Sequence, residues 1–280
     1  VLNRGIELGF GYKNQWNKFT WSSYYTLSMN RNEILDLADD AVNPITGEHF
    51  SIENLDVGGL GQTRFILKKG GGLGDIYSTT ELARDSNGDI YIDENGDIQS
   101  TKINKLEDYI SLGSVFPKSN MGWKNDFRYG NLSVEFLLTA RFGGVVFSRT
   151  QAVLDYYGVS EESALARDNG GVILNGGDYI SAEKWYTTIG SGDAVSPYYI
   201  YDATNVRLQE ASISYYFPRK LFNDVADVTF SLTGRNLLML YCKAPFDPES
   251  VATTDNYYQG MDYFMTPATR SFGLNLRVTF

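Results

Sequence analysis

The chemistry open to this sequence is limited by its single histidine, His49. A Ser-His-Asp triad or a multi-histidine metal site would have to be built around this one residue, which lies in a polar segment. The motifs G-x-S-x-G, H-E-x-x-H and G-x-x-x-x-G-K-[ST] are absent from the sequence. The sequence therefore predicts a protein that is not an enzyme and that has no cofactor, no metal and no catalytic residue.

Two adjacent acidic segments, Asp85–Asp89 and Asp93–Asp97, carry the residue types of a calcium loop. Asp85, Asn87 and Asp89 have the i, i+2, i+4 spacing of an EF-hand. However, the glycine comes one place too early and the glutamate of the twelfth position is missing. Each segment contains an Asn-Gly pair, which is typical of a type I′ hairpin turn. We therefore predict a double hairpin without a tightly held metal.

Two further features have a structural interpretation. The run from Gly70 to Gly74 resembles a phosphate loop in composition only, because no lysine and no helix follow it, so a turn is predicted. Cys242 is the single cysteine, which excludes an internal disulfide. Because its only apparent basic neighbour is Lys243, we interpret it as a small apolar residue rather than a nucleophile.

Aromatic and acidic residues in two long polar segments, 143–204 and 242–269, offer binding chemistry instead. Aromatic rings can stack on a ligand, and they can equally serve as interfacial anchors or as internal loop packing. The candidates for substrate binding or for contact with a partner protein are Asp178, Trp185, Tyr186, Tyr257, Tyr258, Asp262 and Tyr263.

The element that would position these segments is clearest at the C-terminus, where residues 270–280 alternate strictly. One parity is apolar and consists of Phe272, Leu274, Leu276, Val278 and Phe280. The other parity is small or polar and consists of Gly273, Asn275, Arg277 and Thr279. Side chains of a strand point alternately to opposite faces, and a strand of this length crosses a bilayer when tilted. Ending on an aromatic residue, this strand is typical of an outer-membrane β-barrel, and Phe280 is predicted to be its assembly signal.

Other segments alternate in the same way. The clear ones are 18–30 and 132–142, and weaker ones cover about 2–12, 59–67, 74–82, 119–129, 205–217 and 228–241. A charged residue within such a strand, for example Glu135 or Arg141, would cost several kcal/mol against lipid. We therefore expect these residues to face a wet lumen.

The connections alternate in length, as in outer-membrane barrels with short periplasmic turns and long extracellular loops. Short ones are expected near 13–17, 68–73, Gly130 and 218–227, and long ones at 31–58, 83–118, 143–204 and 242–269. About nine or ten spans result, and the C-terminus lies in the periplasm. An odd count of nine cannot close in the usual even-stranded way, so we expect a piece of a larger barrel whose edge strands pair with further protein.

Composition is compatible with this prediction. The 280 residues are 42% apolar and 14% aromatic, and no apolar run approaches the length of a membrane-spanning helix. The formal net charge of −10 argues against a nucleic-acid partner. An enzyme on a small self-contained barrel and a passive porin are the alternatives from other functional classes.

Several motifs carry a family resemblance. Residues 203–218 read ATNVRLQEASISYYFP and residues 232–238 read LTGRNLL. Residues 244–249, 260–264 and 267–271 read APFDPE, GMDYF and PATRS, and upstream segments read NRGIE (3–7), GGVVFS (143–148) and RDNGGV (167–172). Together these motifs resemble the C-terminal part of SusC/RagA-like TonB-dependent transporters of the outer membrane.

This resemblance implies that the chain supplies the C-terminal strands of a 22-stranded transmembrane barrel, while the plug and the N-terminal strands lie outside the sequence. It implies active import of oligosaccharides, or alternatively of oligopeptides. It also implies energy supplied through TonB and a SusD-like lipoprotein as a lid over the extracellular mouth. Lipid of the outer membrane would surround the barrel.

Overall fold

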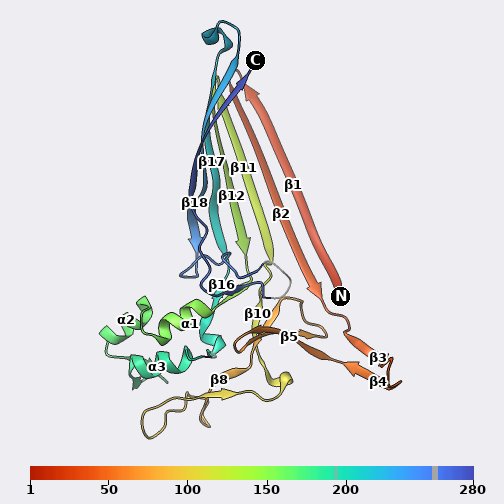
Figure 1. Cartoon of the computed structure of the whole chain (residues 1–280), viewed down its shortest axis with the longest axis vertical. Coiled ribbons are helices and arrows are strands. Elements are labelled where there is room, and N and C mark those ends of the chain that lie inside the picture. Colours follow the sequence, from red (N-terminus) through yellow and green to blue (C-terminus); the bar gives the residue numbers. More distant parts are fainter. Residues whose placement is uncertain (193, 254–257) are drawn as a thin grey trace.

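The computed structural model describes residues 1–192, 194–253 and 258–280. They form a long antiparallel sheet with a folded lobe at one end, and the lobe consists of the described residues of the connections 34–118, 143–204 and 243–270 (Figure 1). Seven strands of the sheet pair in the order β1-β2-β11-β12-β17-β18-β20. Their bounds are Leu2–Trp16 (β1), Phe19–Glu33 (β2), Ser119–Tyr129 (β11), Leu132–Phe142 (β12), Asn205–Phe217 (β17), Asp227–Cys242 (β18) and Ser271–Thr279 (β20). All neighbouring pairs are antiparallel, which confirms the predicted antiparallel β-architecture of this part.

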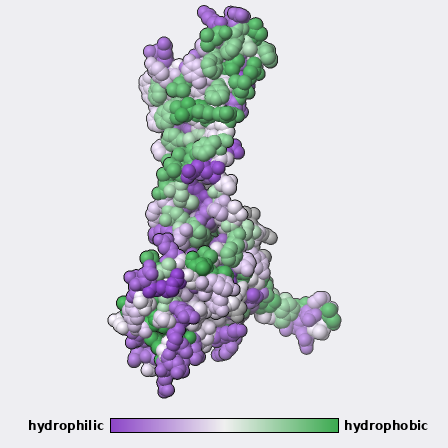
Figure 2. Space-filling model, turned by 60° about the vertical axis from the view of Figure 1, so that its left-hand side comes forward, coloured by the Kyte–Doolittle hydropathy of each residue, from purple (hydrophilic) through white to green (hydrophobic). Residues whose placement is uncertain are grey.

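The register of the sheet sorts apolar and polar side chains onto opposite faces. Between β18 and β20, Phe230 lies opposite Leu276 and Leu232 opposite Leu274. The intervening pair, Ser231 and Asn275, points to the other face. In Figure 2, much of the apolar surface in view lies over the long strands, whereas the lobe is mostly hydrophilic.

Charged side chains on the polar face neutralise one another across strands. Lys124 Nζ lies 3.3 Å from Glu135 Oε2, and Arg235 Nε lies 3.2 Å from Glu210 Oε1. Arg141 donates from Nη2 to the carbonyl oxygen of Val115 at 2.8 Å, which ties the sheet to the lobe. Glu135 and Arg141 thus share the face opposite the apolar one, as predicted.

Polar residues on the apolar face are paired with tryptophans. Trp21 donates from Nε1 to Asn125 Oδ1 at 3.1 Å, and its ring stacks on Phe127 with centroids 6.2 Å apart. On the same two strands, Trp123 of β11 donates from Nε1 to Ser23 Oγ of β2 at 2.9 Å. Each indole therefore shields a polar group that would otherwise be unpaired in an apolar environment.

The predicted number of nine or ten spans is wrong for the sheet, which has seven strands in the described ranges. Segments 59–67 and 74–82 contribute instead to a four-stranded sheet of the lobe, in the order β10-β7-β6-β5. Its bounds are Asn54–Leu60 (β5), Thr63–Lys68 (β6), Asp75–Ser78 (β7) and Ile110–Ser114 (β10). In β6 the neighbours Phe65 and Ile66 are both buried, so both faces of this strand are covered and neither meets lipid.

The remaining strands of the lobe are short. A three-stranded sheet joins Ile200–Asp202 (β16), Val145–Ser148 (β13) and Met261–Asp262 (β19). Three hairpins pair Ala38–Val42 with His49–Ile52 (β3, β4), Thr80–Leu82 with Ser100–Lys102 (β8, β9), and Val172–Leu174 with Asp178–Ile180 (β14, β15). The β3–β4 hairpin projects sideways from the rest of the lobe (Figure 1).

Three α-helices also belong to the lobe, which the all-β prediction did not include. They are Arg149–Tyr156 (α1), Glu161–Asp168 (α2) and Ala182–Ile189 (α3), and 3₁₀ turns cover Leu106–Asp108 (η1), Ser196–Tyr199 (η2) and Arg219–Phe222 (η3, in the β17–β18 turn). Ser148, Ser160 and Ser181 cap the α-helices by accepting a backbone N–H three residues on. Within the described ranges, every helix is too short to traverse a bilayer.

The buried core of the molecule sits in the lobe. It joins side chains from the four-stranded sheet, such as Phe65 and Ile76, to Phe147 of β13 and to Trp185 and Ile189 of α3. Segments that are far apart in sequence therefore fold as one body at one end of the strands.

Connection lengths follow the predicted rhythm with one correction. Residues 17–18, 130–131 and 218–226 make short turns at one end of the sheet, and 34–118, 143–204 and 243–270 make long connections at the other. The expected turn at 68–73 lies inside the lobe, because 31–58 and 83–118 belong to one long connection. The N-terminus lies at the lobe end and the C-terminus at the turn end (Figure 1).

Candidate functional site

A buried ion-pair network, here called the latch, anchors the last long connection to strand β17. Arg207 Nη1 and Nη2 bind Asp247 Oδ2 and Oδ1 at 3.1 and 2.5 Å, and Arg207 Nε donates to Asn205 Oδ1 at 2.8 Å. Asn205 in turn donates from Nδ2 to Glu249 Oε1 at 3.1 Å. Bidentate arginine–carboxylate pairing fixes both distance and orientation, so this segment has one defined seat on the sheet.

Charge is well compensated in the latch. Burial would raise the pKa of the Asp247 carboxyl, but hydrogen bonds from Arg207 and from the Glu249 N–H hold that pKa below its usual range. Asp247 therefore stays ionised at neutral pH. Arg207 is 6% exposed, so neither charge is screened by much solvent.

A second junction ties the same connection to β13. The Phe147 N–H donates to the Gly260 carbonyl at 2.9 Å, and Ser148 Oγ donates to Asp262 Oδ2 at 2.6 Å. The Ala203 N–H also donates to the Gly144 carbonyl at 3.0 Å. The motifs at 143–148, 203–207, 244–249 and 260–262 thus meet at one place, and they act there as structural fasteners of the lobe.

The structure separates the predicted ligand-contact residues into three groups. Trp185 and Asp262 are 8% and 6% exposed, and Tyr186 packs against the core. Tyr258 and Tyr263 are 41% and 50% exposed. Asp178 is exposed on β15 and accepts a hydrogen bond from Asn175 Nδ2 at 3.1 Å. Tyr257 lies outside the described residues.

For the buried group the geometry favours internal packing. The Trp185 ring meets Tyr198 edge-on at 5.3 Å between centroids and belongs to the same core cluster as Met261. The Asp262 carboxylate already accepts a hydrogen bond from Ser148 Oγ. Contact with a ligand is left to the exposed residues. Of these, Tyr258 lies over Gly58 of β5, where an added Cβ would come within 2.6 Å of its hydroxyl.

The acidic double hairpin is present, but its turns differ from the prediction. Gly88 and Gly96 have positive φ whereas Asn87 and Asn95 do not, so the turns are not type I′. In the first turn, Asp85 Oδ1 accepts the N–H groups of Asn87 and Asp89 at 2.8 and 3.0 Å. A three-residue loop with a left-handed glycine connects the two antiparallel segments as a type I′ turn would, and the aspartate side chain stabilises this loop through its hydrogen bonds to the backbone.

An ammonium group lies against the second of these turns. Lys184 Nζ of α3 donates to the carbonyl oxygens of Asn95 and Gly96 at 2.7 and 3.3 Å and lies 2.8 Å from Asp97 Oδ1. These are oxygen ligands of the kind that calcium prefers, and a fixed positive charge already faces them. The contact also docks the hairpin onto the helical part of the lobe.

We predict that micromolar calcium leaves the stability of the full-length protein unchanged, because the Asp85 and Asp93 carboxylates are used by the backbone and no glutamate completes either loop. The measurement is a thermal unfolding curve with calcium and with chelator. A rise in the midpoint with calcium that disappears in Asp85→Asn would contradict the prediction.

A polar node that extends from the buried Asp155 to the exposed Glu162 holds α1 and α2 together. Gln151 Nε2 donates to Asp155 Oδ1 at 2.9 Å and to Glu162 Oε2 at 2.6 Å. Burial raises the pKa of the Asp155 carboxyl, and hydrogen bonds from Ser160 and Gln151 oppose that rise. Because Asp155 is 4% exposed, we assign the node to the structure of the lobe rather than to ligand binding.

Open space occurs on the lobe beside these fasteners. A cavity of about 340 Å³ lies between the β8–β9 hairpin and the segment after α3, lined by Thr80, Ser100, Lys102, Ser191 and Gly192 among others. A smaller one of about 220 Å³ adjoins the latch at Arg141, Glu249 and Gly260. Both are polar enough to hold hydroxyl or amide groups of a ligand.

Taken together, the apolar outer face, the charged inner face and the short turns opposite a large lobe define a segment of an outer-membrane β-barrel. No family model matches the sequence. TonB-dependent receptor P3 of Formosa agariphila is 26% identical over 314 residues, covering 99% of this chain and 28% of the receptor. TonB-dependent receptor P26 of the same organism is 27% identical over 309 residues, covering 99% and 29%.

Solved structures agree on the fold. The RagAB peptide importer in its open-open state matches with a TM-score of 0.68 at 16% identity, covering 99% of this chain and 28% of the importer chain. Its closed-closed state gives a TM-score of 0.65. The chain is thus homologous over its whole length to TonB-dependent receptors, and it spans less than a third of theirs. The curated relatives are receptors that depend on TonB and the solved structures are of a peptide importer, in agreement with the class of protein predicted from the sequence.

Proposed function

We propose that this chain forms the C-terminal barrel wall and part of the extracellular mouth of an active nutrient importer. The observation that carries the proposal is the lobe itself. Motifs from four separate segments, which resemble those of the family, fasten the lobe to the end of the sheet opposite the short turns. Energy would come through TonB, and a SusD-like lipoprotein would cover the lobe. In the described residues β1 and β20 each pair on one side only, so further strands of a 22-stranded barrel, together with a plug, would complete the wall.

Oligosaccharide is the ligand class that we favour. Tyr258 and Tyr263 present exposed rings at the mouth, and Tyr263 is extended by Phe264 at 5.4 Å between ring centroids. Aromatic faces of this kind suit sugar rings. Oligopeptide is the second candidate, because the solved structures with the same fold are of a peptide importer.

Replacing Tyr258 and Tyr263 together by Ala in the full-length receptor is expected to weaken ligand binding or lid association about tenfold or more, since one stacking contact contributes roughly 1–3 kcal/mol. Uptake of labelled oligosaccharides and of peptides, with copurification of the lid, measures the effect. The double Phe variant keeps both rings and is the matched control, so it should retain binding.

Two outcomes would count against these assignments. Normal uptake and lid association in the Ala variant would remove both tyrosines from the site. Uptake that survives collapse of the proton-motive force would favour a passive porin over a TonB-energised importer.

A further inference from the structure

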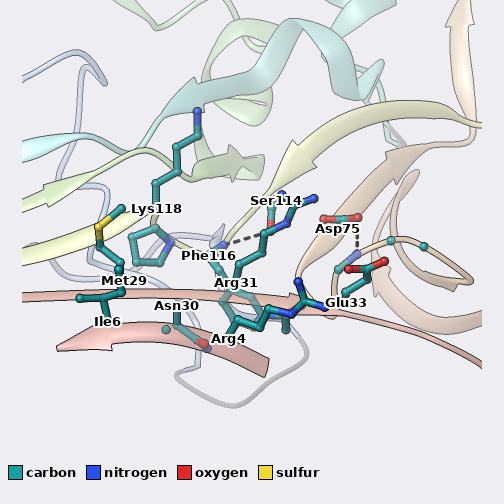
Figure 3. A pocket seen from close by; sticks show the side chains of 16 residues that line it. Arg4, Ile6, Met29, Asn30, Arg31, Glu33, Asp75, Ser114, Phe116 and Lys118 are labelled. Atoms are coloured by element: carbon teal, nitrogen blue, oxygen red, sulfur yellow. Dashed lines mark hydrogen bonds between the residues drawn. The ribbon is translucent and has the colours of Figure 1, made fainter. Parts of the chain in front are cut away.

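A cavity of about 680 Å³ lies where the lobe end of β1 and β2 meets the lobe. Segments 70–75 and 114–118 close it from the other side. Figure 3 shows Arg4, Arg31 and Lys118 around this cavity, with Ile6 and Met29 toward one side and Glu33 and Asp75 toward the other.

Strand register places this cavity on the lipid-facing side of the sheet. Arg4 lies directly opposite Arg31, and Ile6 lies opposite Met29. The next pairs of the same parity are Leu8 with Leu27 and Phe10 with Tyr25, which belong to the apolar face. The two arginines therefore continue the apolar column rather than the lumen wall.

Their height along the strand coincides with the membrane boundary. The same parity of β1 runs from Ile6 through Leu8, Phe10 and Tyr12 to Trp16 and is interrupted only by Asn14. At about 3.3 Å per residue this stretch is about 33 Å long, or about 25 Å high at the usual tilt, which equals the apolar band of an outer-membrane barrel. Arg4 is the next residue of this parity, so it falls at headgroup level.

The cations of the cavity lack partners of their own. Like charges directly opposite on neighbouring strands are unfavourable. Among the described residues, Arg4, Arg31 and Lys118 form no ion pair and no side-chain hydrogen bond. Two carboxylates line the cavity, and that of Asp75 already accepts the Gly72 N–H at 2.7 Å.

We propose that this cavity binds the phosphorylated headgroup of an outer-leaflet lipid. Arg4, Arg31 and Lys118 would hold the phosphate, and an acyl chain would lie along the apolar columns that begin at Ile6 and Met29. Arginine side chains match phosphate oxygens in geometry and charge, and a bound phosphate relieves the repulsion between the two guanidinium groups. The inference rests on the proposed orientation, with the lobe outside the cell.

The test uses the full-length receptor, purified in detergent and analysed by native mass spectrometry with diphosphorylated lipid A, dephosphorylated lipid A and inorganic phosphate as probes. The triple variant Arg4→Gln/Arg31→Gln/Lys118→Gln should bind diphosphorylated lipid A about 100-fold more weakly, because each basic side chain near an anionic lipid contributes a factor of about five. The variant Lys13→Gln/Lys18→Gln/Lys220→Gln makes the same charge change at the turn end and should bind normally.

Each outcome bears on the proposal. Equal lipid binding by the triple variant, or equal wild-type binding of dephosphorylated lipid A, would overturn it. If inorganic phosphate competes for the cavity with the same affinity as the lipid, the cavity binds a free anion rather than a lipid and the proposal is wrong. If the triple variant is not recovered in folded form, Arg31→Gln alone is compared with Lys18→Gln. Binding is measured without transport, so failure of the importer proposal would be seen separately as loss of energised uptake.

Discussion

Replacing Arg207 by Met is expected to destabilise the junction of the lobe and the sheet by about 3–5 kcal/mol, because one partner of a buried ion pair leaves the other uncompensated. Asp247 would lose both of its guanidinium bonds, and Glu249 would lose a cation 3.4 Å away. Met keeps much of the apolar stem, so the effect comes from charge and hydrogen bonding. Denaturant titration of the full-length receptor, with limited proteolysis of the connection at 243–270, measures the loss.

Arg219 provides the matched control. Its contact with Asp227 is 3.6 Å long and solvent-exposed, so Arg219→Met should cost no more than about 1 kcal/mol. The double variant Arg207→Met/Asp247→Leu removes both charges of the buried pair and should recover part of the stability. Equal proteolysis of the Arg207 and Arg219 variants would show that the latch does not hold the connection.

Deleting Phe280 is expected to remove most of the full-length protein from the outer membrane. Phe280 continues the apolar parity of β20 and is 87% exposed at the turn end of the sheet. Transfer of a Phe side chain from water to an apolar environment contributes about 1.5–3 kcal/mol, and we propose that this terminal ring also serves as the assembly signal. Quantitative immunoblotting of membrane fractions measures the abundance.

Two variants bracket this deletion. Phe280→Tyr retains an aromatic end and should insert, and Thr279→Ala changes the opposite parity and should also insert. Unchanged abundance after deletion of Phe280 would rule out an assembly role for the terminal residue.

The barrel strands were predictable from the sequence alone because their environment is set by local alternation. A strand between lipid and water must alternate, so residues 270–280, 132–142 and 18–30 were assigned to the sheet in which the structure places them. Alternation does not distinguish a short core strand from a membrane span, and segments 59–67 and 74–82 were misassigned for this reason. Length and burial on both faces separate the two cases, and burial depends on the rest of the lobe.

The helices of the lobe carry only a weak local signal in the sequence. Ser148 stands three residues before Gln151, and Ser160 is followed by two glutamates, as at helix N-termini. Each helix has only eight residues, so packing against the core rather than local propensity stabilises it.

The roles of the candidate residues were decided by tertiary structure. Sequence composition identified Trp185 and Tyr258 equally as rings in polar connections, but packing buries the first in the core and leaves the second exposed. The motif residues Arg207 and Asp247 were visible as a family signature, whereas their bidentate pairing joins positions 40 residues apart. Such contacts depend on where the β17–β18 hairpin and the folded lobe place each backbone segment, because neither alternation nor spacing encodes a long-range distance. Local alternation therefore specifies which strand residues share the apolar face and which share the polar face. The folding of the lobe, by contrast, specifies which of its polar and aromatic residues are buried in the structure and which stay exposed.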